Sequence, residues 1–356
     1  MAKQRKVACV RHDGRVECVT QPIPELKDGE VLVKVHASLI SPGTEMNLVR
    51  TRRETPDKAG SDLNFGYSSA GEIVAIKGDP KDLKVGMAVA GMGGGACHGT
   101  FNVIPVNLVV PIPDGVSYEE ATFASLAATS LQAVRRTEPA LGEYGMVLGL
   151  GIVGNLAAQL YQLSGARVLG WESLRSRAAI GRKCGIADTI DFTKIDAAAA
   201  SRAFAAPYGM DFALLAFGGN AEKAFMAVKQ SMKVSADGHA MGRVVVVGGC
   251  RFPFDGGAWT GNLDVRCSSR TGAGYHDPDW EHGKDYPAAF VQFTSQRNAR
   301  ELLQLIAEKR LLVSPMITTA LPLKEINSAA DLLLNDPGRT MGVIIEMPHA
   351  RSRGEK

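Results

Sequence analysis

The chain has 356 residues, of which 45% are hydrophobic and 22% charged, and its formal net charge is +3. Because a single hydrophobic core stops growing at roughly 250–300 residues, this length predicts two domains. The small net charge gives no electrostatic basis for binding nucleic acid or an anionic membrane.

No feature of the sequence indicates a membrane or secreted protein. No apolar run approaches the roughly 20 residues of a membrane span, and charges interrupt the N-terminus too early for a signal peptide. The six cysteines are scattered without a C-x-x-C pair, which is typical of free thiols in a reducing compartment. We therefore expect a cytoplasmic protein. The one basic cluster, "VRTRRE" (49–54), is interpreted as a solvated loop rather than a phosphate clamp.

The first third of the chain is predicted to be β-rich. Its strand-like runs contain β-branched residues in alternation with polar ones and are separated by turn residues. These runs are 6–10, 15–20, 30–40, 71–76, 87–91 and 107–113.

The pattern changes at about Ser117, where a serine followed by acidic residues predicts an N-capped helix over 117–137. From there, strands and helices alternate. Alternation with nearly continuous apolar strands predicts a parallel sheet covered on both faces. The predicted strands are 144–150, 167–172, 188–192, 210–218 and 242–249, and the predicted helices are 154–165, 176–185 and 220–233.

The alternation stops after Cys267. An irregular segment, a long helix over 295–311 and short apolar strands at 317–323 and 342–347 close the chain. This tail is too small to form a domain, so we expect it to return to the β-rich part. The predicted domains are 1–125 together with 288–356, and an inserted nucleotide-binding domain at 126–287.

A glycine-rich loop lies between a predicted strand and a predicted helix. "GLGIVG" contains Gly149, Gly151 and Gly154. In a nucleotide-binding turn the first glycine makes the turn and the second lets the backbone approach a pyrophosphate. The third lets the helix pack on the strand, with the helix N–H groups facing the phosphates. The motif in this context predicts a dinucleotide site.

Glu172 ends the next predicted strand, where a carboxylate accepts hydrogen bonds from the ribose of NAD and repels the 2′-phosphate of NADP. Arg175 and Arg177 follow closely, so NADP stays an alternative to the favoured NAD. The glycines at 216–220 and 246–250 follow predicted strands. They either line the crevice that holds the dinucleotide or form ordinary turns. The residues predicted to bind the dinucleotide are Gly149, Gly151, Ile152, Val153, Gly154, Glu172, Ser173, Arg177, Thr129, Phe217, Gly218, Val247, Gly248 and Gly249.

The order of these parts resembles the medium-chain dehydrogenase/reductase superfamily over nearly the whole chain. The resemblance is carried by "SPGTE" (41–45), "GYSSAG" (66–71), "VIPVNL" (103–108), "IPDGVSYEEA" (112–121), "GLGIVG" (149–154) and "GYHDPDWEHGKDYP" (274–287). It is closest to a zinc-lacking branch that also forms the N-terminal half of bi-domain oxidoreductases of saccharide biosynthesis. The resemblance implies an α/β protein with a GroES-like catalytic domain, an inserted Rossmann domain and a homodimer.

The resemblance also indicates that no zinc is bound. Zinc-dependent members hold their metal with a Cys in "C-G-x-D" and a His in "G-H-E", where this chain has Pro42 and Tyr67. Proline cannot bind a metal, and tyrosine is a poor zinc ligand. The four-cysteine structural lobe is absent too, since "AGMGGGACHGT" contains only Cys97. A new site made by Cys97, His98 and His276 is the less favoured alternative.

Without zinc, side chains must polarise the substrate oxygen and move its proton. Tyr67 matches a metal-ligand position, so its hydroxyl should face the substrate, but its pKa near 10 would need a cation or the nicotinamide charge to lower it. Glu45 would orient Tyr67 or hold a sugar hydroxyl. His98 titrates closer to neutrality. A packed core tyrosine, a surface carboxylate and a loop histidine are the plain structural alternatives. We favour Tyr67 narrowly as the catalytic acid/base.

The segment 275–286 combines aromatic, acidic and histidine side chains in twelve residues. Such loops on a rigid scaffold are commonly functional, and this mixture suits a polyhydroxylated ligand. A subunit-interface or lid loop is the alternative. We predict substrate contacts from Ser41, Tyr275, His276 and Asp277. Thr129 matches the helix start that meets the nicotinamide in relatives, or is a mid-helix hydroxyl bonded to the preceding turn.

Together these features predict a zinc-independent, NAD(P)-dependent alcohol dehydrogenase or ketone reductase. Its expected substrate is a small sugar, aminosugar or cyclitol-like polyol. An NADPH-dependent quinone or enoyl reductase and a non-catalytic NAD(P)-binding redox sensor are the rival interpretations.

Overall fold

The computed structural model describes residues 3–57, 59–254, 256–257 and 260–348. The contacts between residues divide the chain into two compact units. Unit 1 consists of residues 1–128 and 271–356, and unit 2 of residues 129–270. Residues 271–287 therefore belong to unit 1, whereas the sequence-based boundary assigns them to the nucleotide-binding domain.

Unit 1 is built on a seven-stranded sheet of order β17-β18-β3-β5-β6-β8, in which β7 also pairs with β3. A three-stranded sheet of order β2-β1-β4 lies in the same unit. Strand β18 pairs antiparallel with β3, so the tail of the chain returns to the N-terminal strands, as predicted. The strands are β1 (Gln4–Val10), β2 (Val16–Pro22), β3 (Glu30–Ile40), β4 (Leu63–Asn64), β5 (Ser68–Lys77), β6 (Ala88–Met92), β7 (Phe101–Pro105), β8 (Val109–Pro111), β17 (Ile317–Pro322) and β18 (Gly342–Glu346).

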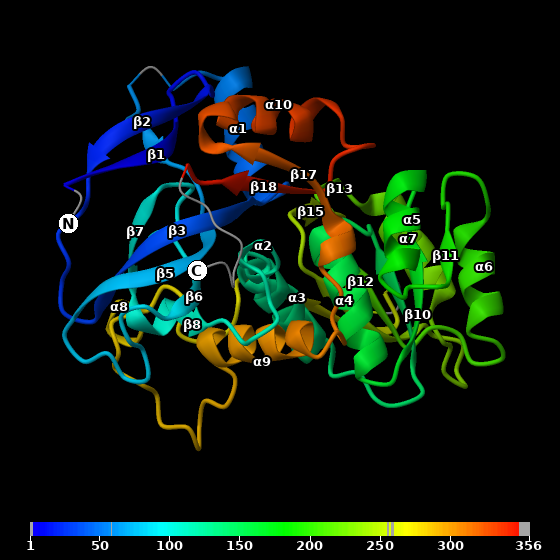
Figure 1. Cartoon of the computed structure of the whole chain (residues 1–356). Coiled ribbons are helices and arrows are strands. Elements are labelled where there is room, and N and C mark those ends of the chain that lie inside the picture. The colour runs from blue at the N-terminus through cyan, green and yellow to red at the C-terminus, as the bar shows by residue number, and fades with distance from the viewer. Residues whose placement is uncertain (1–2, 58, 255, 258–259, 349–356) are drawn as a thin grey trace. The chain divides into compact units, whose positions relative to one another are not determined.

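The helices of unit 1 include one that the sequence analysis missed. The cluster at 49–54, expected to be a loop, lies in α1, and its Arg52 is buried and donates to the carbonyls of Val10, Arg11 and Ser61. The loop prediction was wrong: Arg52 and Arg53 donate to carbonyls of other segments, and only Arg50 of the three arginines is exposed. Figure 1 shows α1 beside α10, with which it is in contact. The helices are α1 (Thr44–Glu54), α2 (Tyr118–Ala121), α8 (Pro278–Glu281), α9 (Ser295–Ala307) and α10 (Ile326–Asn335), with short 3₁₀ turns at Val106–Leu108, Ser314–Met316 and Leu323–Glu325.

The helix expected over 117–137 is split in two. Ser117 accepts from the backbone N–H of Glu120, and the Glu120 side chain accepts from the Ser117 N–H, which is a capping box. The short helix α2 that it starts ends at Ala121, and α3 (Ala124–Thr137) follows. The predicted N-cap is confirmed, and the uninterrupted helix is not.

Unit 2 contains a six-stranded sheet of order β11-β10-β9-β12-β14-β16. All its neighbouring strands are parallel, as predicted. Figure 1 shows helices α4 to α7 packed around these strands. The sequence analysis missed α6. The elements are β9 (Tyr144–Leu148), α4 (Ile152–Leu163), β10 (Arg167–Trp171), α5 (Arg175–Lys183), β11 (Thr189–Ile190), α6 (Ala197–Phe204), β12 (Phe212–Leu215), β13 (Gly219–Asn220), α7 (Glu222–Ser231), β14 (Met241–Val246), β15 (Cys250–Arg251) and β16 (Asn262–Cys267).

The core of unit 2 explains why the strands are so apolar. Met146, Leu148, Leu169, Ala213 and Val244 are buried in one cluster, because a parallel sheet covered by helices has no solvated face. Among the described residues, no helix is both long and apolar enough to span a membrane.

Candidate active site and dinucleotide site

The glycine loop has the geometry that a dinucleotide requires. Gly149 has a φ of +89°, which side chains rarely adopt. A Cβ on Gly154 would lie 1.8 Å from the Gly149 carbonyl oxygen, so only glycine lets the helix approach the turn. Gly151 caps α4 without a side-chain hydrogen bond. Ile152 and Val153 begin this helix, so their N–H groups lie at its positively polarised end.

The other loops predicted to line the dinucleotide lie against this turn. A Cβ on Gly149 would meet the Ala216 carbonyl oxygen at 3.2 Å and the Phe217 Cβ at 3.6 Å. One on Gly248 would lie 2.0 Å from the Phe217 carbonyl oxygen. The ends of β9, β12 and β14 therefore meet at one edge, which is the ligand-binding edge of such sheets. The same edge includes the predicted residues Gly218, Val247 and Gly249.

Glu172 is buried at the end of β10 and holds the glycine loop. One of its carboxylate oxygens accepts from the N–H of Leu150 at 2.9 Å, and the other accepts from the N–H of Leu174 at 2.9 Å. A carboxylate has about four acceptor positions, so both oxygens can still accept from ribose hydroxyls. Glu172 therefore fits a dinucleotide ribose and also fixes the turn that faces the pyrophosphate.

The arginines after Glu172 differ in position. Arg177 is half-buried, and its Nη1 lies 4.0 Å from the position that a Cβ atom on Gly151 would take. Its buried Nε has no hydrogen-bond partner among the described residues. Its cation therefore lies beside the loop that would hold phosphates. Arg175 and Ser173 are exposed.

In unit 1, Tyr67 lies at the start of β5 within a group of hydroxyls. The side chains of Ser41 and Thr44 hydrogen-bond to its hydroxyl. Burial and the Glu45 carboxylate raise the pKa of Tyr67 above its ordinary value, and the two hydroxyls oppose that rise. Tyr67 is therefore protonated at neutral pH. The sequence analysis expected a cation or the nicotinamide charge to lower this pKa. Among the described residues, no cationic side chain is a main cause of the shift.

Glu45 and His98 form a buried pair beneath these hydroxyls. The Nε2 atom of His98 lies 3.0 Å from Glu45 Oε1, and its Nδ1 lies 2.7 Å from the hydroxyl of Ser38. Glu45 Oε2 accepts from the N–H of Ser41 at 2.6 Å. Glu45 is only 5% exposed and His98 is fully buried. Neither is a surface carboxylate or an open loop histidine, and both are placed to hold the segment that carries Ser41.

Two residues of this group were not singled out from the sequence. Thr44 stands inside "SPGTE", between Pro42 and Glu45, so the motif contained a signal for it. Ser38 is an ordinary strand residue of β3, and no local pattern marks it as a partner of His98.

The segment 275–286 uses most of its polar groups on itself. Asp277 caps α8 by accepting from the N–H groups of Asp279 and Trp280, and it also accepts from the Tyr286 hydroxyl at 2.5 Å. His276 is exposed, and its N–H donates to the Glu281 carboxylate. The density of polar residues is therefore partly explained by local folding.

Tyr275 is the residue of this segment that faces the hydroxyl group of Tyr67. Its ring lies 3.6 Å from a Cβ built on Gly93, whose N–H donates to the Tyr67 carbonyl. The two tyrosines also interact electrostatically. Tyr67 and Tyr275 are thus close in space, although about two hundred residues separate them in sequence.

Two points remain: the predicted nicotinamide contact Thr129, and the less favoured alternative of a metal site made by Cys97, His98 and His276. Thr129 lies within α3 rather than at its start. Among the described residues, no three His, Cys, Asp or Glu side chains are grouped to hold a metal. The Cys97 thiol donates to the Gly94 carbonyl, and burial raises its pKa to about 11. The Cys97 thiol is therefore engaged by a backbone carbonyl.

Comparisons with known proteins agree with this architecture. No family model matches the chain. The sorbitol dehydrogenase of Bacillus subtilis (strain 168) is 28% identical over 269 residues, which cover 66% of this chain and 75% of that protein. The L-threonine 3-dehydrogenase of Rhizobium johnstonii is 26% identical over 221 residues, which cover 54% of this chain and 64% of that protein.

Solved structures match over nearly the full length. The crystal structure of AibC superposes with a TM-score of 0.78 at 22% identity, covering 98% of this chain and 97% of that one. An alcohol dehydrogenase of Escherichia coli CFT073 complexed with NADH gives 0.72 at 14% identity, covering 97% and 100%. A dehydrogenase of Sinorhizobium meliloti 1021 bound to NADP gives 0.73 at 18% identity, again covering 97% and 100%.

The chain has the fold of the medium-chain dehydrogenases/reductases and is similar in part of its sequence to dehydrogenases. The partly similar curated proteins are dehydrogenases of sorbitol and of L-threonine, and two solved structures of the same fold hold NADH or NADP, a nicotinamide dinucleotide cofactor. The glycine loop and Glu172 of unit 2 are the residues that fit this cofactor.

Proposed function

We propose that this chain is a medium-chain dehydrogenase/reductase of the zinc-lacking branch and interconverts a secondary alcohol and a ketone on a sugar, aminosugar or cyclitol. The observation that carries the proposal is the group formed by Tyr67, Ser41 and Thr44 above the buried Glu45–His98 pair. Tyr67 replaces a metal ligand of zinc-dependent relatives, and its hydroxyl takes over polarisation of the substrate oxygen.

The neutral state of Tyr67 determines its role. A phenol whose pKa is raised is a hydrogen-bond donor at neutral pH, so it can stabilise a carbonyl oxygen and protonate the alkoxide formed as hydride arrives. Donating this proton leaves a phenolate, and in the reverse direction only that phenolate, not the neutral hydroxyl, can take the alcohol proton. The dinucleotide supplies or accepts the hydride when it is bound.

Glu45 and His98 act as positioning residues in this proposal. Because His98 is fully buried and both ring nitrogens have partners, it orients Glu45, which in turn holds the backbone of Ser41. Tyr275 lies beside Tyr67 and is the best-placed substrate contact of its segment. The polyol class is supported by these hydroxyl groups and by the similarity to a sorbitol dehydrogenase.

NAD is the proposed cofactor, because Glu172 faces the dinucleotide loop with a carboxylate that would repel a 2′-phosphate. The decisive experiment is a screen of polyols, deoxysugars and cyclitols with NAD and NADP, together with ketones, enones and quinones with the reduced cofactors. We expect turnover of at least one polyol or its ketone, with preference for NAD. Turnover of enones or quinones alone, or cofactor binding without any turnover, would contradict the proposal.

A further inference from the structure

Arg177 lies in the first turn of α5, against the glycine loop of unit 2. A Cβ built on Gly151 would lie 4.0 Å from Nη1 of Arg177, and outside its own chain neighbours it would meet no other described atom within 4 Å. The second glycine of a nucleotide-binding turn is the one that lets the backbone approach a pyrophosphate. The guanidinium of Arg177 therefore borders the space in front of that glycine.

Within the described part of the chain, this cation lacks a partner. Its buried Nε has no hydrogen-bond acceptor, and no ion pair joins Arg177 to Glu172 or to another carboxylate. A guanidinium has five N–H donors, and a half-buried one without an acceptor loses hydration without compensation. An anionic ligand would supply the missing acceptors.

The neighbouring helix ends also favour an anion. The N-cap residues Gly151 and Leu174 offer no side-chain acceptor to α4 and α5. The first turn of α5 contains no acidic residue but carries Arg175 and Arg177, although a cation is unfavourable at the positively polarised end of a helix. Folding alone therefore does not explain an arginine that is half-buried at this place.

Glu172 separates two places at which a dinucleotide could present a phosphate. Its carboxylate accepts from the N–H groups of Leu150 and Leu174, at the strand end where ribose hydroxyls bind and a 2′-phosphate is repelled. An arginine that bound a 2′-phosphate would lie beside this carboxylate. Arg177 makes no ion pair with Glu172 and faces Gly151 instead, which favours the 5′-phosphates of the ligand.

We propose that Arg177 is the cation that pairs with the pyrophosphate of the bound dinucleotide, and that it does not recognise a 2′-phosphate. The inference rests on the dinucleotide site of the proposed function and specifies which part of that ligand the guanidinium binds. Hydrogen bonds from a guanidinium to phosphate are charge-assisted and strong, and they neutralise phosphate charge next to the buried carboxylate of Glu172.

The test is a titration of the full chain with adenosine, 5′-AMP, its isomer 2′-AMP and ADP, followed by NMR at the backbone amides of Gly151 and Ile152. In Arg177→Gln, the dissociation constants of 5′-AMP and ADP should rise about tenfold, and those of adenosine and 2′-AMP should change less than about twofold. Arg177→Lys keeps the charge but loses the planar fork, so its affinity for 5′-AMP should be intermediate.

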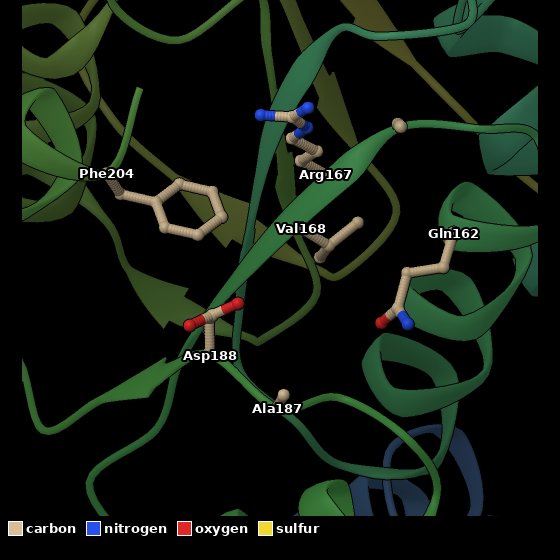
Figure 2. Close-up of a pocket in the computed structure, with 7 residues that line it drawn as sticks. Gln162, Arg167, Val168, Ala187, Asp188 and Phe204 are labelled. Atoms are coloured by element: carbon tan, nitrogen blue, oxygen red, sulfur yellow. The ribbon is translucent and has the colours of Figure 1, made fainter. Parts of the chain in front are cut away.

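Arg167→Gln is the matched control, because Arg167 begins β10 and so lies at the opposite edge of the same sheet. There it lines a pocket with Val168, Asp188 and Phe204 (Figure 2), and its Nη1 donates to the Tyr144 hydroxyl at 2.7 Å. This variant should bind all four ligands as wild type does.

Urea unfolding of the unliganded chain separates binding from folding. Because the guanidinium of Arg177 is unpartnered and lies at a helix N-terminus, Arg177→Gln should unfold at the same urea concentration as wild type or at a higher one. Unfolding at lower urea with equal losses for all four ligands would assign Arg177 to the fold and overturn the proposal.

The ligand series also distinguishes the other outcomes. A loss for adenosine as large as that for 5′-AMP, a selective loss for 2′-AMP, or no loss at all would overturn the proposal. A wild-type chain that bound none of the four ligands would overturn the dinucleotide site together with it. A chain that binds them as expected but turns over no polyol would contradict only the proposed function.

Discussion

At the scale of single residues, the environment of Tyr67 decides what chemistry the site can perform. Tyrosine acts as a base at neutral pH only when a cation lowers its pKa. Here burial and the Glu45 carboxylate raise the pKa instead, and the surrounding hydroxyls of Ser41 and Thr44 only moderate this effect. The residue is therefore suited to donate a hydrogen bond to a carbonyl oxygen.

Removing the Tyr67 hydroxyl tests this role. Tyr67→Phe keeps the ring and its packing, so we expect kcat to fall by about 10²–10⁴-fold while the affinity for the dinucleotide changes little. Steady-state kinetics and a cofactor titration measure the two quantities. Full activity in this variant would show that the proton comes from another group.

His98→Gln is the matched comparison. Since His98 supports buried Glu45, its loss should reduce the free energy of unfolding by about 1–3 kcal/mol, and kcat should fall without a change in the pH profile. Urea unfolding and kcat measured over a range of pH provide the data. If the pH profile lost a limb near neutrality, His98 rather than Tyr67 would carry the proton.

Glu172 combines cofactor choice with support of the loop. Glu172→Ser removes the acceptors for the N–H groups of Leu150 and Leu174 as well as the repulsion of a 2′-phosphate. We expect NAD affinity to fall by about tenfold or more, and the ratio of NADP to NAD affinity to rise. Fluorescence titrations with both cofactors measure this ratio. If the wild-type protein prefers NADP, Arg177 rather than Glu172 determines the choice of cofactor.

At the scale of elements, the segment 275–286 shows how polar residues can serve a loop's own structure. Asp277 caps α8 and binds Tyr286, while Trp280 is buried beneath them. The Asn107 side chain donates to the Trp280 carbonyl and so connects the segment to the turn after β7. These bonds hold Tyr275 near Tyr67 without requiring a ligand.

The Asp277–Tyr286 bond predicts an acid-sensitive opening of this segment. The Tyr286 hydroxyl and two backbone N–H groups lower the pKa of Asp277 below its ordinary 3.8. A carboxyl group whose pKa is lower in the folded than in the unfolded chain stabilises the folded chain at pH values above the unfolded pKa. This stabilisation is lost as the pH falls through the folded pKa. The Trp280 indole resonance should therefore report opening below about pH 4.

Tyr286→Phe removes the largest of these effects and should move the opening to higher pH. Lys284→Gln breaks the surface pair with Asp279 and removes only the smaller Coulombic effect of Lys284 on Asp277, so its midpoint should move less than that of Tyr286→Phe. Identical midpoints for wild type and Tyr286→Phe would show that the hydroxyl contributes nothing to the segment.

At the scale of the whole molecule, our proposal combines the fold of a medium-chain dehydrogenase/reductase with the absence of its usual metal. Pro42 and Tyr67 stand at the two ligand positions, and the Cys97 thiol is turned toward a backbone carbonyl. We expect purified protein to contain well under one zinc per chain and to keep its activity in EDTA. Stoichiometric zinc by elemental analysis, with activity lost on chelation and restored by zinc, would disprove this.

Much of the fold could be predicted from the sequence because the relevant signals are local. Apolar runs of the right length predicted most strands of both units, though not β7 or β16, and the capping residues around Ser117 predicted a helix start. Helices α1 and α6 were missed, since the first is rich in arginine and the second is a short alanine-rich run. The burial of Arg52 depends on carbonyls of distant strands, which no local pattern reveals.

The sequence by itself determined the class of fold and the position of the glycine loop before Glu172, because each depends on residue type at short spacing. Only the tertiary structure decided that Glu45, His98 and Ser38 form one buried chain and that Tyr275 approaches Tyr67. The physical reason is that burial and electrostatic interaction depend on distance in space. Residues from β3, α1, β5 and a distant loop meet only after the sheet has formed.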